Sequence, residues 1–271
     1  RVGLELERLA NHTGDLGAIA GDTGFLPTAS WNGRIRGDFL NTTACLCGNR
    51  FGRGLLRPGG TAYDLDADGC ADMLARIKTA GRDVRGAMDV MLHTESVLER
   101  LTGTGYVSRE SAQNLGLVGM AARACGLKVD ARFHFPLADL PTRDCAPRVE
   151  TTGDVLARTL VRSKEIDDSL RLLEADISTL ASLPPLAEQP DAEALASLPP
   201  DTLAVSQVEG WRGEICHVAV TGPDGRFLTY KAIDPSFHNW PGLAMALRGN
   251  QISDFPLCNK SFNLSYCGHD L

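Results

Sequence analysis

The sequence lacks any run of about 18 or more apolar residues, the length that a membrane-spanning helix needs, so we expect no segment to cross a membrane. It also lacks an excess of basic charge, because 27 Lys and Arg stand against 34 Asp and Glu, which gives a formal net charge of −7. Aromatic residues make up only 6% of the chain, and no Lys/Arg cluster interleaves with them. Binding to nucleic acid is therefore not expected.

Several motifs of nucleotide and hydrolase chemistry are absent as well. The chain has no P-loop, no GxSxG, no HExxH and no GxGxxG, so none of the sites that these motifs build is indicated. Eight cysteines are present without a single CxxC pair. A chain of 271 residues can bury a core without disulfides, so we interpret the cysteines as cytosolic thiols that pack as small hydrophobic side chains.

The composition that is present indicates a folded globular protein, with 43% hydrophobic and 23% charged residues. We expect residues 1–271 to form a single, mainly α domain with a helical core, two long helices and a small antiparallel β-hairpin. The chain begins without Met and inside a helical pattern, so we also expect it to be a fragment of a longer protein.

Apolar residues that recur at a spacing of three, four or seven predict helices in the first part of the chain. This spacing predicts a helix over residues 1–22 and one long helix over residues 67–102, which Asp66 or Asp68 can cap. Residues 23–66 between them are rich in Gly, Asn, Thr and Arg. They predict irregular structure with at most short helices.

A second long helix is predicted over residues 152–182, with Thr152 as its cap and with its charged residues facing solvent or a partner. A Pro- and Ala-rich stretch over residues 182–201 predicts a surface linker. Two alternating segments around a Gly-Pro-Asp-Gly turn then predict a β-hairpin over residues 214–233.

Residue types alone offer few candidates for a chemical site. Cys258, Cys267 and His269 lie within twelve residues and are potential metal ligands, although Cys-x-His is not a standard chelating spacing and a packed C-terminal tail is the alternative. We expect His12 to be a hydrogen-bonded core histidine rather than a ligand. For Arg212, residue type favours a surface turn over a fixed cation in a pocket.

Segments in order along almost the whole chain resemble a known family. They are Arg1–Asp22, Leu56-Arg57-Pro58-Gly59-Gly60, Arg100–Gly105, Gly116–Gly119, Arg123–Gly126, Gly153–Glu174, Glu209–Glu214 and Asp234–Leu243. They are similar to the large subunit of complex I-related nickel–iron hydrogenases of group 4, the hydrogenase-4/formate hydrogenlyase type, and to the 49 kDa subunit of complex I. The resemblance implies that large-subunit fold, of which residues 1–271 would form the C-terminal part.

The resemblance also implies an active cavity at an interface with a small iron–sulfur subunit. In the hydrogenases this cavity holds Ni–Fe on cysteines, whereas in complex I the metal is lost and the cavity binds quinone. The positions that match the two C-terminal cysteine ligands hold Ser265 and Gly268, and Cys267 lies one residue out of register. Serine and glycine cannot supply the soft thiolates that nickel needs, so nickel is not expected, and Cys267 and His269 stay minor metal candidates.

Two further roles come from the resemblance. Arg212 matches the arginine of the family's Arg-Gly-Glu turn and is expected to act as a catalytic electrostatic element in the cavity, while His12 would orient the first helix. The residues expected to face the cavity or the cluster-bearing partner are Arg57, Pro58, Gly59, Gly60, Ser265 and Gly268.

The expected function is that of a hydrogenase-like or NADH dehydrogenase-like large subunit of a membrane-associated, complex I-like oxidoreductase. It would transfer electrons at the interface with the iron–sulfur subunit, to quinone and without Ni–Fe. Two alternatives stay open, a genuine nickel–iron hydrogenase large subunit and a non-catalytic structural subunit.

We expect the fragment itself to bind no cofactor, because the iron–sulfur cluster would lie in the partner subunit. The expected partners are that small subunit and other subunits of a complex I-like or hydrogenase-4-like assembly, without nucleic acid. The protein would be cytoplasmic and peripheral to the inner membrane, with its membrane contact made indirectly through partner subunits.

Overall fold

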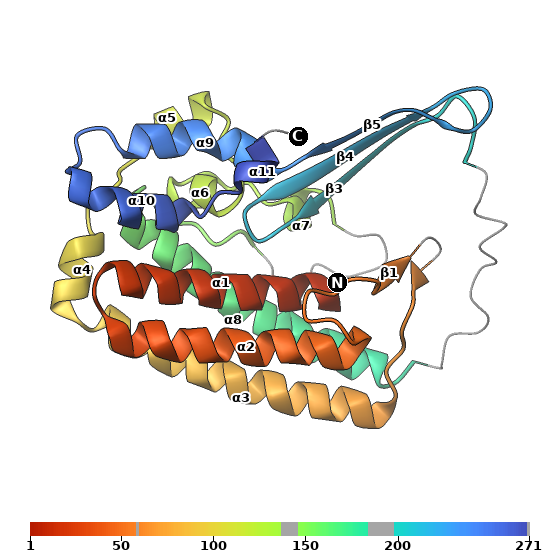
Figure 1. The fold of residues 1–271 in the computed structure, drawn as a ribbon, viewed down its shortest axis with the longest axis horizontal. Coiled ribbons are helices and arrows are strands. Elements are labelled where there is room, and N and C mark those ends of the chain that lie inside the picture. The colour runs from red at the N-terminus through yellow and green to blue at the C-terminus, as the bar shows by residue number, and fades with distance from the viewer. Residues whose placement is uncertain (58–59, 137–145, 184–197, 270–271) are drawn as a thin grey trace.

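Long helices that lie side by side make the body of the protein (Figure 1). The structure is a computed structural model that describes residues 1–57, 60–136, 146–183 and 198–269. Helix α8 packs against both α1 and α3, and α2 lies between α1 and α3. The long helices are α1 (Val2–Asp22), α2 (Leu26–Cys47), α3 (Ala67–Leu92) and α8 (Val155–Leu180).

Shorter helices form a second layer on the side of α1 that faces away from α2 (Figure 1). This layer has its own apolar core, and α8 contributes side chains to both cores. The elements of this layer are α5 (Arg109–Asn114), α6 (Gly119–Ala124), α7 (Ala131–His134), α9 (Pro235–Ala246), the 3₁₀ turn η1 (Ile252–Asp254), α10 (Phe255–Phe262) and α11 (Tyr266–His269). Helix α4 (Glu95–Leu101) lies at the end of the long helices and packs into their core.

Two small antiparallel sheets complete the described chain. Strands β1 (Leu56–Arg57) and β2 (Gly60–Thr61) form a short ribbon. Strands β3 (Leu203–Glu209), β4 (Glu214–Thr221) and β5 (Phe227–Ile233) pair in the order β3-β4-β5 and point away from the helices (Figure 1). The mainly α fold with small antiparallel strands is therefore confirmed. No helix of the described residues is both long and apolar enough to span a membrane.

Helix α1 confirms the prediction for residues 1–22. Its side chains Leu6, Leu9 and Leu16 recur at helical spacing and are fully buried. Gly17 lets α2 come close, because a Cβ atom at this position would lie 2.9 Å from the Cβ of Asn32.

Helix α2 shows that the prediction of irregular structure over residues 23–66 was wrong. Its buried side mixes polar with apolar residues, so the apolar spacing in the sequence is weak. Thr28 is buried and its hydroxyl donates a hydrogen bond of 2.9 Å to the carbonyl of Ala87 on α3. Packing between α1 and α3 therefore stabilises a helix that local sequence does not favour.

The single helix predicted over residues 67–102 is in fact two. The predicted cap is present, since Asp66 accepts a hydrogen bond of 2.7 Å from the amide of Gly69. Helix α3 ends at Leu92, and α4 starts after Thr94 and runs in another direction (Figure 1). The apolar spacing continues across the break, which is why sequence periodicity predicted one helix.

Helix α8 confirms the second long helix and corrects two details. Asp154, not Thr152, caps it by accepting a hydrogen bond of 2.8 Å from the amide of Ala157, and Thr152 donates to Asp154. The charged residues expected to face solvent or a partner are buried only in part, because α1, α3, α6 and α10 all pack around this helix while Lys164, Arg171 and Glu174 are exposed. Its buried charged residues are Arg158, Arg162, Glu165 and Asp168.

The hairpin predicted over residues 214–233 is present as β4 and β5, with β3 as an unpredicted third strand. Most of the predicted linker, residues 184–197, lies outside the described residues. The single-domain organisation of residues 1–271 stays a prediction.

Candidate functional site

Arg212 lies on the tight turn between β3 and β4. Its Nε donates a hydrogen bond of 2.5 Å to the carbonyl of Asn263, and its guanidinium carbon lies 3.8 Å from the centre of the Trp211 ring. The turn packs directly against Gly119, because a Cβ atom added at Gly119 would lie 2.2 Å from the carbonyl oxygen of Arg212. The φ of +63° at Gly119 also favours glycine at this position. This close packing of the two backbones fixes the position of Arg212. The side chain of Arg212 is half-buried and does not lie free on a surface turn.

The surroundings of Arg212 combine burial with nearby carboxylates. Burial lowers the pKa of Arg212, while Asp15 and Asp234 oppose that shift. Asp15 is itself engaged, accepting hydrogen bonds from Asn263 at 2.6 Å and from Arg162 at 3.0 Å. Within the described part of the chain the two terminal nitrogens of Arg212 make no hydrogen bond, so they can donate to an anionic or carbonyl group.

Ser265 and Gly268 lie on the C-terminal segment that follows Asn263, so the structure brings both close to the Arg212 turn. The Ser265 hydroxyl accepts a hydrogen bond of 3.1 Å from the Gly268 amide. Gly268 packs tightly on the start of α9, since a Cβ at this position would lie 2.5 Å from the Cγ of Asp234. A cysteine at position 268 would therefore displace Asp234.

His12 lies in the core between α1 and α8, as expected from residue type. Its Nε2 is 2.8 Å from Oε2 of Glu165, and neither side chain is exposed. Burial lowers the pKa of His12. The expected role of His12 in orienting α1 stays a prediction.

Glu165 belongs to a larger buried charge network that reaches the Arg212 turn. Arg123 donates to Glu165 from Nε at 2.8 Å and to Glu209 from Nη1 at 2.7 Å. Arg8 donates to the carbonyl oxygens of Glu209 at 2.6 Å and Gly210 at 3.0 Å. Burial would raise the pKa of Glu165, but Arg123 and His12 lower it well below its ordinary value.

The sequence predicted no role for Glu165, Arg123 or Glu209. Arg123 and Glu209 lie within segments that carry the family resemblance, and Glu165 lies on the helix whose charged face was expected to be solvated. A usable signal was the spacing of Arg158, Arg162 and Glu165, which places three charges along one side of α8.

Arg57 and Gly60 lie on the β1–β2 ribbon, and both are exposed. This ribbon follows Leu55, whose side chain packs near Gly3 at the start of α1. Neither residue makes a hydrogen bond or ion pair with the Arg212 turn within the described ranges. The structure therefore does not bring this part of the predicted site to Arg212. Pro58 and Gly59 lie outside the described residues.

The C-terminal metal candidates do not form a cluster among the side chains that the structure describes. Cys258 is fully buried, whereas Cys267 is exposed. No group of three or more His, Cys, Asp or Glu in the described residues could hold a metal ion. The side chain of His269 lies outside that description.

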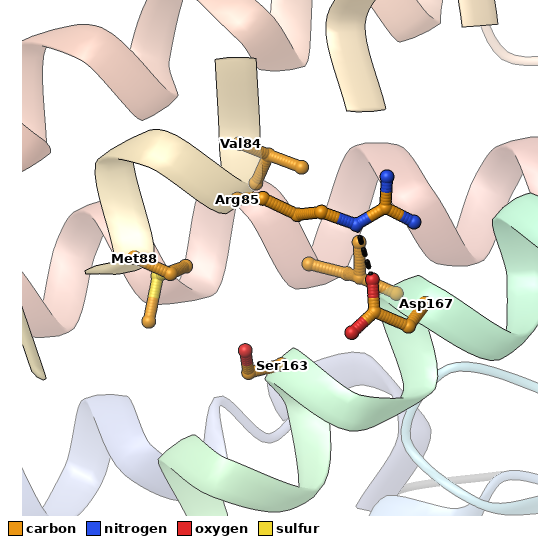
Figure 2. A pocket seen from close by; sticks show the side chains of 6 residues that line it. Val84, Arg85, Met88, Ser163 and Asp167 are labelled. Carbon is orange, nitrogen blue, oxygen red and sulfur yellow. Dashed lines mark hydrogen bonds and ion pairs between the residues drawn. The ribbon is translucent and has the colours of Figure 1, made fainter. Parts of the chain in front are cut away.

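A small depression between α3 and α8 lies apart from these residues (Figure 2). Figure 2 shows Arg85 reaching across to Asp167, and the ion pair measures 2.6 Å from nitrogen to oxygen. None of the predicted site residues lines it, and we assign it no role. Its lining residues are Val84, Arg85, Met88, Ser163, Ile166 and Asp167.

The helical core and the protruding three-stranded sheet define a mainly α protein with small antiparallel strands, and comparison with known families shows which family has this fold. Residues 22–270 match the family described as respiratory-chain NADH dehydrogenase, 49 Kd subunit. The chain belongs to this family, which confirms the resemblance found in the sequence.

Curated relatives include components of both hydrogenases and NADH-quinone oxidoreductases. Hydrogenase-4 component G of Escherichia coli is 30% identical over 267 residues, covering 97% of this chain and 43% of the relative. An NADH-quinone oxidoreductase subunit of Bacillus mycoides is 30% identical over 264 residues, covering 93% of this chain and 68% of the relative. Formate hydrogenlyase subunit 5 of Escherichia coli is 28% identical, with 97% and 45% covered. The chain thus spans less than half the length of the two Escherichia coli relatives.

A solved structure shares the fold. The structure of the membrane-bound sulfane sulfur reductase, an archaeal respiratory membrane complex, contains a chain that matches with a TM-score of 0.86. The match covers 99% of this chain and 73% of that chain, at 23% sequence identity. At this identity the likeness shows the fold alone.

Proposed function

We propose that this chain is part of the large subunit of a complex I-like, membrane-associated oxidoreductase, in which electrons pass at an interface with an iron–sulfur subunit to a quinone acceptor. Family membership supports the class, and the curated relatives carry the names of hydrogenase-4, formate hydrogenlyase and NADH-quinone oxidoreductase components. The cluster would be held by the partner subunit, and contact with the membrane would be made through other subunits.

The observation that carries the proposal is the half-buried Arg212 on its fixed turn. Its terminal nitrogens have no hydrogen-bond partner among the described residues, and its position is set by Asn263 and by the crossing with Gly119. A preorganised cation stabilises negative charge that develops on an oxygen without reorganising during the reaction. Arg212 would serve in this way beside a carbonyl oxygen of the acceptor.

The residues around Arg212 do not fit a nickel–iron centre. The two positions that match cysteine ligands hold Ser265, whose hydroxyl accepts a hydrogen bond from the Gly268 amide, and Gly268 itself. At Gly268 there is no room for a Cβ unless Asp234 moves. We therefore propose a member of the family that works without Ni–Fe, and derive no step through nickel.

One observation favours the structural alternative, in which the chain keeps its interface but has no redox role. The Trp211 ring stacks on the Arg212 guanidinium and covers one of its faces. The terminal nitrogens of Arg212 make no hydrogen bond among the described residues, so we place this alternative second.

The test uses the full-length protein expressed with its iron–sulfur partner and maturation proteins. Nickel and iron are quantified, and quinone reduction is measured for the natural sequence, Arg212→Gln and the control Arg226→Gln. Arg226 is a matched control because its side chain is 88% exposed at the tip of the β4–β5 hairpin. We expect iron from the partner's cluster, no stoichiometric nickel, and quinone turnover that falls about 100-fold in Arg212→Gln alone.

Other outcomes contradict the proposal in different ways. Stoichiometric nickel would make the chain a hydrogenase subunit with unusual ligands. An assembled complex that contains the chain but never reduces quinone would support the structural alternative. Equal loss of turnover in Arg212→Gln and Arg226→Gln would remove Arg212 from the site.

A further inference from the structure

The buried charge network contains more acidic than basic side chains. It lies where α1, α6, α7, α8 and β3 meet, and its members are within 1% of complete side-chain burial except for Arg132, which is 14% exposed. Four carboxyl groups face three guanidinium groups and one imidazole. The members are Glu5, Asp130, Glu165 and Glu209, with Arg8, Arg123, Arg132 and His12.

If every carboxyl and guanidinium group were ionised, the network would carry one uncompensated negative charge. An unpaired charge in a protein interior is strongly unfavourable, so the network needs one more positive charge. A bound proton supplies it. The proton sits either on His12 or on one of the carboxyl groups.

The contacts of His12 argue that this residue stays neutral. Its Nε2 faces Glu165, whereas its Nδ1 is buried without a hydrogen-bond partner among the described residues. Protonation of both nitrogens would leave a charged N–H donor buried and unsatisfied. The hydrogen bonds therefore assign a neutral ring that donates from Nε2 to Glu165, and burial lowers the pKa of His12 in the same sense.

The carboxyl groups differ in how well basic groups surround them. Glu165 has the fullest set, with Arg123 at 2.6 Å, His12 at 2.8 Å and Arg8 at 3.9 Å. Glu209 has one close guanidinium nitrogen, Nη1 of Arg123 at 2.7 Å.

Among the described residues, the remaining two carboxyl groups each face two guanidinium groups, whereas the Glu209 carboxyl group contacts one. Asp130 faces Arg132 through two guanidinium nitrogens, at 2.7 and 3.0 Å, and Arg123 at 3.5 Å. Glu5 faces Arg8 at 3.1 Å and Arg132 at 3.7 Å. Its Oε2 accepts a hydrogen bond of 2.6 Å from Ser169, while its Oε1 has no hydrogen-bond partner within the described ranges.

The guanidinium contact of Glu209 also lies near a second acid. The Arg123 nitrogen that Glu209 contacts lies 3.5 Å from the carboxylate of Asp130, and it donates its hydrogen bonds to Glu209 and to the carbonyl of Val129. Its other carboxyl oxygen accepts a hydrogen bond of 2.9 Å from the amide of Ala131. Across the β3–β4 ladder its paired residue is Glu214, and Arg8 binds the backbone carbonyl of Glu209 rather than its carboxyl group.

We propose that Glu209 is the proton-binding residue of this network and is held neutral at physiological pH. Burial raises the pKa of Glu209 and the neighbouring Asp130 adds to this shift, while Arg123 opposes it. Loss of this proton places a buried negative charge three residues before Arg212, on the turn that Arg8 holds. The site thus couples the charge beside Arg212 to proton concentration, and it does not depend on the proposed acceptor.

The experiment compares Glu209→Gln in the full chain with Glu110→Gln, an exposed change on α5 that leaves the charge of the network unaltered. Infrared spectra at pH 7 report the C=O stretch of a protonated carboxylic acid, which a carboxylate lacks. We expect this band in the natural chain and in Glu110→Gln, and its loss in Glu209→Gln. Glu165→Gln removes one negative charge from the network, so the same charge balance lets Glu209 ionise and the band should be lost there as well.

Denaturant unfolding across pH gives an independent readout. A carboxyl group with a raised pKa binds a proton on folding, so its contribution to stability is present at low pH and is lost as pH rises through the folded-state pKa. Glutamine mimics the protonated form, so the stability of Glu209→Gln should fall less than that of the natural chain as pH rises. Absence of the infrared band at pH 7, or its persistence in Glu209→Gln, would overturn the proposal.

Discussion

Two fully buried arginines, Arg123 on α6 and Arg158 on α8, differ in the charge of the groups that they contact. Arg123 contacts Glu165, Glu209 and Asp130, all within 3.5 Å. Arg158 donates to oxygen atoms that carry no charge, the Ser261 hydroxyl and the carbonyls of Gly153 and Gly105, at 2.8 to 3.1 Å. Its guanidinium carbon also lies 4.4 Å from the centre of the Phe262 ring.

The difference shows what a buried cation needs and what it can do. Burial alone would lower the pKa of either arginine, but the carboxylates around Arg123 raise its pKa above the ordinary value. Arg158 lacks such hydrogen-bonded carboxylates, and burial lowers its pKa to about 10. Arg158 therefore joins three chain segments as a hydrogen-bond donor, whereas Arg123 balances a set of charges that reaches the Arg212 turn.

The largest expected effect comes from Arg123→Met. This change leaves the carboxylate of Glu165 buried without its main cation and removes a hydrogen-bond donor of Glu209, and breaking a buried ion pair from one side costs about 4 kcal/mol. Denaturant unfolding at pH 7 measures the loss, with Arg123→Lys as the variant that keeps the charge and should recover part of it. A loss below about 1 kcal/mol would mean that the carboxyl groups take up protons at little cost.

A smaller effect with a distinctive pH dependence is expected for Glu165→Gln. The pKa of Glu165 lies well below its ordinary value, so its stabilising contribution is present above the unfolded-state pKa and is lost as pH falls through the folded-state pKa. The variant should lose about 3 kcal/mol at pH 7 and progressively less as the pH falls below about 4. Unfolding curves from pH 3 to pH 7 measure this, and a loss independent of pH would contradict the ionised state of Glu165.

The sequence predicted those helices and strands whose residue pattern repeats locally. Helices α1 and α8 carry buried apolar residues at helical spacing, and the hairpin of β4 and β5 has alternating residues around a turn. Helix α2 escaped prediction because residues such as Thr28 and Asn32 on its buried side are polar. Thr28 and Asn32 become core residues only because α2 packs against α1 and α3.

The buried network could not be predicted from spacing, because its contacts join distant positions. Arg123 is 42 residues from Glu165 and 86 residues from Glu209. The family resemblance did place Arg212, Ser265 and Gly268 as candidates. In the structure Arg212 binds the carbonyl of Asn263, two residues before Ser265, and Gly268 packs on Asp234, whose charge acts on Arg212. The structure does not bring Arg57 or Gly60 to the same place, because their ribbon packs near the start of α1.

Arg158→Met is expected to cost less than Arg123→Met, about 2 kcal/mol. The change removes hydrogen bonds to neutral oxygen atoms but leaves no buried carboxylate without its counter-charge. Unfolding of the two variants under identical conditions tests the comparison directly. Equal losses would show that burial and packing, rather than charge compensation, decide the cost of removing a buried arginine here.

The smallest effect concerns the thiol beside Arg158. Cys258 is fully buried, and an added Cβ at Gly105 would lie 2.9 Å from both its Sγ and Nη2 of Arg158. Burial raises the pKa of Cys258, although Arg158 opposes the shift. The thiol is therefore a packing group and not a counter-charge, and Cys258→Ala should cost about 1 kcal/mol while the Arg158 hydrogen bonds persist.

Thiol titration separates this reading from a thiolate paired with Arg158. In the folded chain Cys267 and Cys45, which are exposed, should react quickly with a disulfide reagent at pH 8, and Cys258 only after unfolding. A thiolate at Cys258 would instead make Cys258→Ala about as costly as Arg158→Met, because removal of either partner would strand a buried charge. A buried thiolate would then balance the charge of Arg158, as carboxylates balance the charge of Arg123.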